Sequence, residues 1–158
     1  MKTKSLLYTF LSIFCFTLSC TPKVDSEAEK LNVEKVVNEF YQSFEQKDID
    51  RMSDLMAHDE SMLSFGTGIT DIHKSWKEWK ENHMAQFEAF DEAKINSKNL
   101  NVYLSETGNV AWFADISDWT LVIKKETIQM NDIRITGVLE KRNNVWKIVQ
   151  IHASVPQR

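Results

Sequence analysis

The chain has 158 residues, of which 42% are hydrophobic and 27% are charged, and its formal net charge is −4. This length suits one domain with its own hydrophobic core. The charged residues are interspersed along the chain, so we interpret them as a solvated surface. Nucleic acid binding requires clustered Lys and Arg, which this mildly acidic chain lacks, and we therefore exclude nucleic acid as a partner.

The first twenty residues have the layout of a bacterial export signal. Two lysines precede an apolar stretch, residues 6–18, which is shorter than the roughly 20 residues of a membrane-spanning helix. Cys20 follows Leu18 and Ser19 as in a lipobox, although Thr17 stands where lipoboxes usually carry Leu, Val or Ile. We expect a lipidated Cys20 and a membrane-anchored protein of the cell envelope, periplasmic or surface-facing. A plain cleaved signal and an uncleaved anchor are the alternatives.

Cleavage before Cys20 divides the chain into three parts. Residues 1–19 form the signal peptide, residues 20–29 a short tether, and residues 30–156 the folded domain. Loss of the two leader lysines changes the formal net charge from −4 to −6. The only other cysteine, Cys15, leaves with the signal peptide, so we expect no disulfide in the mature domain.

Two helices are predicted next. Ser26 and Glu29 fit a capping box that begins a helix ending at about Lys47. Asp48 is placed to cap a second, short helix. The apolar residues of the first helix recur at helical spacing: Leu31, Val33, Val36, Val37, Phe40, Tyr41 and Phe44. Those of the second helix are Ile49, Met52, Leu55 and Met56.

A strand, a turn and a third helix follow. Residues 61–65 are predicted as a brief strand that ends in a turn at Gly66-Thr67-Gly68. Thr70 or Asp71 then caps a helix that ends near Phe87. One face of this helix carries Ile72, Trp76, Trp79, His83 and Phe87.

From about Glu92 the hydrophobic period changes from helical to two. This change predicts four long strands, at about 93–104, 109–123, 131–142 and 145–155. The polar break Arg142-Asn143-Asn144 predicts a hairpin between the last two. Long strands twist and curl. We therefore predict an α+β domain, in which about three N-terminal helices pack on a strongly curved antiparallel sheet to form a cone with a mouth at one end.

The order of these elements resembles the nuclear transport factor 2 superfamily of cone-shaped domains. Three C-terminal motifs resemble its SnoaL-like branch, and similar endings occur in the association domain of calmodulin-dependent kinases. These motifs are Arg134-x-Thr136, Trp146-x-Ile148 and His152-x-Ser154. The first two helices resemble the same branch through Phe40-Tyr41, Phe44, Lys47-Asp48-Ile49-Asp50 and Leu55. The resemblance covers about residues 30–155 and implies a ligand-sized cavity. It names no reaction, because the superfamily hosts isomerases, dehydratases, cyclases, assembly modules and binders.

Two aspartates interrupt the apolar strand predicted at residues 109–123. Asp115 and Asp118 are three positions apart, so they point to opposite faces of an ideal strand. Only one of them can face the cone unless a bulge intervenes. A lone carboxylate in an apolar cavity has a raised pKa and can act as a general base. A position at the rim or on the surface is the alternative for both.

The third predicted helix offers another candidate base. Trp76, Trp79 and His83 share a stripe that belongs either to the core or to the wall of a cavity. In the second interpretation, His83 lies beside Tyr41 and binds a ligand or accepts a proton near neutral pH. Trp112 would add to an aromatic pocket of this kind.

The C-terminal hairpin carries two further candidates for ligand binding. His152 alternates on one strand face with Trp146, Ile148 and Gln150, but no carboxylate beside it orients its ring. A hydrogen-bonded strand residue is the alternative. Arg134 would bind a carboxylate of the ligand, provided that it faces inward. No group of His, Asp and Glu has the spacing of a metal site, so we expect neither a metal nor another cofactor.

Three functions fit these observations. The first is a lipid-anchored domain that binds a small, partly apolar molecule and catalyses no defined reaction. The second is a cofactor-free isomerase, dehydratase or cyclase, with His83, Asp115 or Asp118 as base and Tyr41 as hydrogen-bond donor. The third is an assembly module that dimerises through the outer face of the sheet. We rank them in this order, and a homodimer is compatible with all three.

Overall fold

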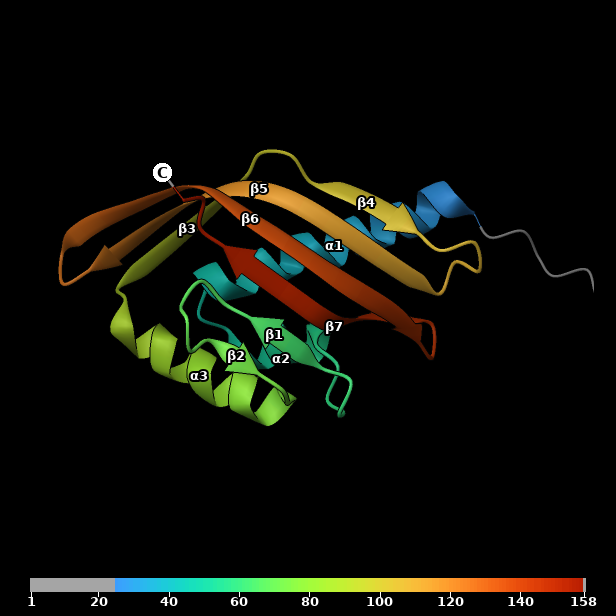
Figure 1. The fold of residues 1–158 in the computed structure, drawn as a ribbon, viewed down its shortest axis with the longest axis horizontal. Coiled ribbons are helices and arrows are strands. Elements are labelled where there is room, and N and C mark those ends of the chain that lie inside the picture. The colour runs from blue at the N-terminus through green and yellow to red at the C-terminus, as the bar shows by residue number, and fades with distance from the viewer. Residues whose placement is uncertain (1–24, 158) are drawn as a thin grey trace, which may run out of the picture.

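The computed structural model describes residues 25–157, which fold into three helices on one curved sheet (Figure 1). The helices are α1 (Ser26–Glu45), α2 (Ile49–Leu55) and α3 (Trp76–Ala89). The strands are β1 (Leu63–Phe65), β2 (Ile72–His73), β3 (Glu92–Ser97), β4 (Asn101–Leu104), β5 (Val110–Ile123), β6 (Glu126–Arg142) and β7 (Val145–Ser154). Their order in the sheet is β2-β1-β7-β6-β5-β3, and β4 also pairs with β5.

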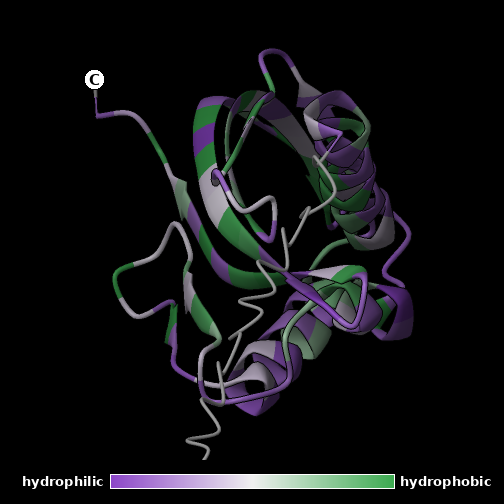
Figure 2. Ribbon diagram, turned by 90° about the vertical axis from the view of Figure 1, so that its right-hand side faces the viewer, coloured by the Kyte–Doolittle hydropathy of each residue, from purple (hydrophilic) through white to green (hydrophobic). Residues whose placement is uncertain are grey.

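The predicted α+β architecture is confirmed, with one difference in the sheet. Strand β1 pairs with β7 in parallel, so the sheet is mixed rather than wholly antiparallel, and it does not close. The other pairs are antiparallel. Figure 2 shows how strongly the sheet curls, with hydrophobic and hydrophilic residues alternating along its strands. The concave side is covered by α1 and α3, as the long, curling strands require.

Helix α1 begins one residue earlier than its sequence suggested. Asp25 is the N-cap and accepts a hydrogen bond from the Ala28 amide at 3.2 Å, so the prediction of Ser26 as the cap is wrong. Glu29 instead accepts hydrogen bonds from Lys141 Nζ at 2.6 Å and from Trp146 Nε1 at 2.8 Å. These contacts fasten the first turn of α1 to the C-terminal hairpin, within the segment predicted as a tether.

The second helix is confirmed and the start of the third is corrected. Asp48 caps α2 by accepting a hydrogen bond from the Arg51 amide at 3.0 Å. Helix α3 starts after Ser75, whose hydroxyl accepts a hydrogen bond from the Glu78 amide at 3.3 Å. The predicted start at Thr70 or Asp71 is wrong, because the residues that follow form strand β2, which pairs with β1.

Two of the long strands differ from the prediction. The predicted strand at 93–104 is broken into β3 and β4, which both pair with β5. Strand β6 begins at Glu126, five residues early, because its distal half continues the ladder with β5. The hairpin turn is confirmed at Asn143 and Asn144, whose φ angles of 50° and 64° are those of a two-residue turn.

The core lies between the concave side of the sheet and the helices α1 and α3. Its fully buried side chains include Trp79, Phe113, Leu139 and Ile148. Gly137 on β6 lies against the Phe113 ring, and a Cβ there would also be only 2.8 Å from the Gln150 carbonyl oxygen. The sheet can therefore pack tightly at this point only with glycine.

None of the helices between residues 25 and 157 is both long enough and apolar enough to cross a membrane. The predicted signal peptide and the predicted lipidation site, Cys20, lie outside the described residues.

Candidate functional site

A cavity of about 100 Å³ lies between α3, α1 and the β1–β2 loop, with the β5–β7 side of the sheet as its back wall. Its aromatic lining comes from Phe40, Phe44, Phe65, Trp79 and Trp119. Its polar lining includes Ser64, Thr67, Asp71, His73, Asn82, His83 and Gln86. The polar groups gather on α3 and on the β1–β2 hairpin, whereas the sheet contributes Trp119 and aliphatic side chains. The cavity is thus apolar on the side of the long strands, whereas α3 and the β1–β2 hairpin contribute both polar and aromatic side chains.

His83 is the polar residue whose chemistry is best defined. Its ring lies 4.1 Å from the Trp79 ring, centroid to centroid, and its Nδ1 is 2.9 Å from the Trp79 carbonyl oxygen. Because a carbonyl oxygen only accepts, Nδ1 carries the proton and Nε2 keeps its lone pair. Burial lowers the pKa of His83 to about 4, although the hydrogen bond to the Trp79 carbonyl oxygen and, less strongly, the charge of Asp71 oppose this shift. His83 is therefore neutral at pH 7 and presents a hydrogen-bond acceptor or base.

Asp71 closes the loop between β1 and β2. Its Oδ2 accepts a hydrogen bond from the Gly68 amide at 3.0 Å, and its carbonyl oxygen accepts one from the Gly66 amide at 2.7 Å. A Cβ at either glycine would lie 2.7 Å from an Asp71 side-chain atom, so the two glycines allow the loop to wrap around this carboxylate. The predicted turn is confirmed, and its hydrogen bonds hold Asp71 at the cavity.

Two amides complete the polar side. Asn82 and Gln86 lie one turn apart on α3, and Gln86 Nε2 donates a hydrogen bond to Asn82 Oδ1 at 2.5 Å. This bond leaves the Gln86 oxygen and the Asn82 nitrogen as one acceptor and one donor for a ligand. His73, which is buried on β2, also lines the cavity.

Tyr41 and Asp115 form a buried pair that does not line the cavity. The Tyr41 hydroxyl donates to Asp115 Oδ2 at 3.1 Å, and the Asn99 amide donates to Asp115 Oδ1 at 3.2 Å. Burial and the neighbouring Asp115 charge raise the pKa of Tyr41 well above its usual range. The expectation that His83 lies beside Tyr41 is wrong, because Tyr41 faces Asp115 on β5. The pair joins α1 to the sheet.

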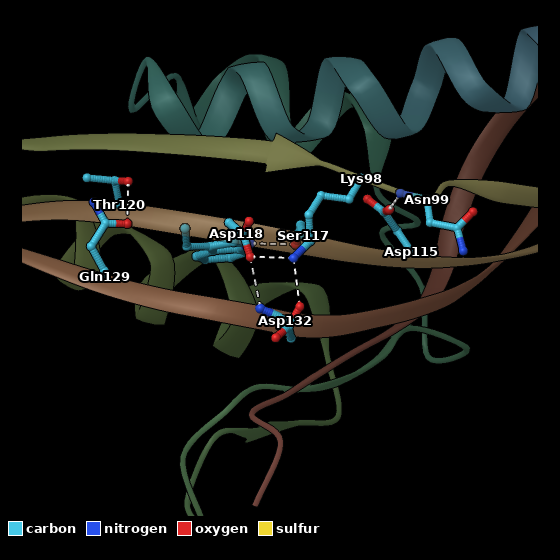
Figure 3. Close-up of polar contacts among 9 residues, drawn as sticks. Lys98, Asn99, Asp115, Ser117, Asp118, Thr120, Gln129 and Asp132 are labelled. Atoms are coloured by element: carbon cyan, nitrogen blue, oxygen red, sulfur yellow. Dashed lines mark hydrogen bonds and ion pairs between the residues drawn. The ribbon is translucent and has the colours of Figure 1, made fainter. Parts of the chain in front are cut away.

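Asp118 lies on the other face of β5, as the three-residue spacing predicted. It sits where the β5–β6 register shifts, and it accepts hydrogen bonds from Lys98 Nζ at 2.7 Å and from the Asp132 amide at 3.0 Å. Figure 3 shows Lys98 and Asp132 around Asp118, with Asp115 directed toward Asn99. The Lys98 ammonium group lowers the pKa of Asp118. Asp118 is thus a paired carboxylate, remote from the cavity.

The remaining sequence candidates from the sheet lie on its outer face. Trp112, Arg134 and His152 are exposed, and none of them lines the cavity. Trp112 stacks on Tyr103 instead, with ring centroids 5.9 Å apart. The expected common face of His152 and Ile148 is wrong, because a bulge at β7 lets Ile148 point inward and His152 outward.

Trp76 also lies outside the cavity. Its ring packs against the His58 imidazole at 4.2 Å, centroid to centroid, and Lys80 Nζ lies 5.1 Å from its ring centre.

Of the seven ligand-binding residues predicted from sequence, only Trp79 and His83 line the cavity. No group of three metal-ligating side chains forms within residues 25–157.

Sequence reasoning missed Asp71, His73, Asn82 and Gln86 as lining residues. A signal for part of this set was present. Asn82 and Gln86 fall three and seven residues after Trp79, on the helical stripe that also holds His83. No local pattern predicted that Asp71 and His73 line the cavity, because their position depends on a hairpin whose strands have only three and two residues.

These features define an α+β domain with a small, partly aromatic cavity at the open side of a curved sheet. The sequence profile of the SnoaL-like domain matches residues 33–158. The chain therefore belongs to the SnoaL-like domain family. No curated protein matches the chain in sequence.

Several solved structures share the fold. A provisionally assigned dehydratase of Streptomyces avermitilis has a TM-score of 0.76 at 13% identity, over 84% of this chain and 99% of its own. A nuclear transport factor 2-like superfamily protein from Salmonella enterica serovar Typhimurium has a TM-score of 0.75 at 18% identity, over 84% and 94%. A provisionally assigned scytalone dehydratase of Novosphingobium aromaticivorans has a TM-score of 0.73 at 11% identity, over 83% and 86%. At these identities the likeness concerns the fold.

Proposed function

We propose that this protein is a binding domain that holds a small, partly apolar molecule in the cavity beneath α3. The observation that carries this proposal is one cavity whose lining combines aromatic side chains, among them Trp79 and Trp119, with a few polar ones, among them His83. Small-molecule sites have this composition, with a few polar groups that orient an otherwise apolar ligand. The His83 Nε2 lone pair has no hydrogen-bond partner among residues 25–157, so it is available to such a ligand.

Blocking the cavity tests this proposal. Ala153 lines the cavity, whereas Ala114 lies exposed on the outer face of the sheet. With benzyl alcohol as the probe, saturation-transfer NMR should show contact with the wild-type protein and with Ala114→Phe, and none with Ala153→Phe. Undiminished transfer from a folded Ala153→Phe protein to benzyl alcohol would contradict the proposal. Native mass spectrometry of protein from its own host should reveal a bound small molecule.

A second candidate function is proton-transfer catalysis without a cofactor. The neutral His83 supports it, because Nε2 could remove a proton next to a carbonyl group. The two provisionally assigned dehydratases with the same fold point in the same direction. Deuterium uptake from D₂O into small cyclic ketones, followed by NMR, tests this activity. Catalysed uptake should vanish in His83→Gln and persist in Asp118→Asn. Equal rates with and without protein would remove this candidate.

We also propose that Cys20 carries a lipid that anchors the domain in the cell envelope. The supporting observation is the signal-like sequence before it. Labelled palmitate should enter the wild-type protein in its host and stay out of Cys20→Ala. Recovery of the wild-type protein entirely in the soluble fraction would speak against an anchor.

The outer face of the sheet is the proposed homodimer contact. Tyr103, Trp112 and Ile116 lie 50%, 45% and 38% exposed on adjoining strands, which is unusual for side chains of this size. Light scattering after size exclusion should give twice the monomer mass, and Trp112→Glu should give the monomer. A wild-type monomer at high concentration would rule out both the dimer and a role as an assembly module.

A further inference from the structure

The charge of the cavity narrows the ligand class. No Lys or Arg is among the residues that line it, and Asp71 is the only carboxylate there. Oδ2 of Asp71 is used by the Gly68 amide, whereas Oδ1 has no hydrogen-bond partner among residues 25–157. Arg134, the residue that suggested a carboxylate ligand, lies on the outer face of the sheet. An anionic ligand would therefore meet an anion and find no cation to pair with.

The aromatic side chains of the cavity favour the same ligand charge as the Asp71 carboxylate does. Phe44 and Trp119 pack together with ring centroids 5.2 Å apart, and Phe40 and Trp79 do so at 6.2 Å. All four rings line the cavity. The faces of aromatic rings carry negative electrostatic potential and attract a desolvated cation by about 0.5–2 kcal/mol each. A ring cluster of this kind beside a lone carboxylate favours a positively charged guest over a neutral one of the same shape.

We propose that the ligand of this cavity is a small organic cation, an amine or a quaternary ammonium compound, held between the aromatic cluster and the Asp71 carboxylate. This inference rests on the proposed binding function and specifies its ligand class. The imidazole of His83 adds an acceptor for the N–H of an amine, because its proton sits on Nδ1. The amide oxygen of Gln86 is a second acceptor on the same helix.

Two sets of probes of matched shape separate charge from size. Choline and 3,3-dimethylbutan-1-ol differ essentially in one positive charge, and benzylamine, benzyl alcohol and benzoate cover all three charge states. Isothermal titration at pH 7 should show each cation binding about tenfold tighter than its neutral counterpart, which corresponds to about 1.4 kcal/mol. Benzoate should bind most weakly of these three aromatic probes.

Three variants assign the preference to residues. Asp71→Asn keeps an acceptor for the Gly68 amide, so the loop should keep its shape while the cation preference falls to about twofold or less. Trp119→Leu should weaken choline more than 3,3-dimethylbutan-1-ol. The control is Asp132→Asn, which removes an exposed carboxylate at a φ of 59°, a conformation that Asn tolerates well, and it should keep the full preference.

The outcomes separate this inference from the proposed function. Equal binding of cations and neutral probes, or an unchanged preference in Asp71→Asn, overturns the cation assignment and leaves the cavity as a binding site for neutral molecules. Saturation transfer to benzyl alcohol that survives Ala153→Phe overturns the proposed binding function itself. Cation preference that falls only in the two cavity variants supports the inference.

Discussion

The carbonyl oxygen of Trp79 lies 2.9 Å from Nδ1 of His83, one turn further along α3. This contact determines what the cavity can do, because it places the imidazole proton on the nitrogen that faces the helix. The other nitrogen then keeps its lone pair. The Trp79 ring stacks on the same imidazole and helps to exclude water from it. Exclusion of water disfavours the charged ring, so His83 acts as a neutral acceptor.

The first prediction concerns this proton. The pKa of His83 should be about 4, against about 6.5 for an exposed histidine. Two-dimensional ¹H–¹⁵N spectra of the imidazoles, recorded from pH 3.5 to 8, should show one ring that stays neutral to about pH 5 with its proton on Nδ1. That signal should be missing in His83→Gln. A titration of this ring near pH 6.5 would contradict the burial that we describe.

The second prediction links this pKa to stability. The folded protein takes up a proton at His83 only near pH 4, whereas the unfolded chain does so near pH 6.5. Because the unfolded state binds more protons in between, the free energy of unfolding should fall as the pH drops from 6.5 to 4. His83→Gln should flatten this dependence by on the order of 1–3 kcal/mol, measured by urea unfolding. His152→Gln, on the outer face, should leave it unchanged.

The third prediction concerns the buried pair of Tyr41 and Asp115, which joins α1 to the sheet. Tyr41→Phe removes one of the two hydrogen bonds to the Asp115 carboxylate. An under-satisfied buried carboxylate should lower the free energy of unfolding by about 1–3 kcal/mol. Tyr103→Phe is the matched control, since its half-exposed ring lies on the outer face, and it should change stability by less than about 0.5 kcal/mol. Equal effects of the two substitutions would show that the pair adds nothing to stability.

The local signals in the sequence were the reliable ones. Asp48 caps α2 and Asn143-Asn144 turns the last hairpin, because both features depend on a few neighbouring residues. The three-residue spacing of Asp115 and Asp118 likewise gave their opposite faces. The α+β fold followed from these signals and from the change of period near Glu92. The predicted start of α3 was wrong. The helix starts later because β2 pairs with β1, and neither strand is long enough to show alternation in the sequence.

The candidate site was harder to predict, because alternation tells which residues share a face and not which face is inside. Trp112 and Trp119 lie on the same strand, seven residues apart, and only Trp119 faces the cavity. The bulge in β7 changed the parity between Ile148 and His152. Arg134 could not be placed for the same reason. Asp71 enters the cavity through the loop between β1 and β2, two strands too short to show alternation in the sequence.

The fourth prediction tests the tightest contact in the sheet. In Gly137→Ala the new methyl group would meet the Phe113 ring, which is only 2% exposed and has no room to turn away. We expect the free energy of unfolding to fall by about 1–3 kcal/mol, as for other overpacked cores. Thr136→Ala, on the exposed side of the same strand, should cost less than about 0.5 kcal/mol.

A double-mutant cycle assigns that loss to the clash. Phe113→Leu makes room beside Gly137 and on its own leaves part of the space empty. If the methyl group and the ring compete for one volume, the double variant should be more stable than the sum of the two single losses predicts. Additive losses would mean that Gly137→Ala acts through the backbone, by way of the Gln150 carbonyl oxygen 2.8 Å from the new Cβ. Urea unfolding of the four proteins distinguishes the two causes, because the coupling free energy differs from zero only when the side chains collide.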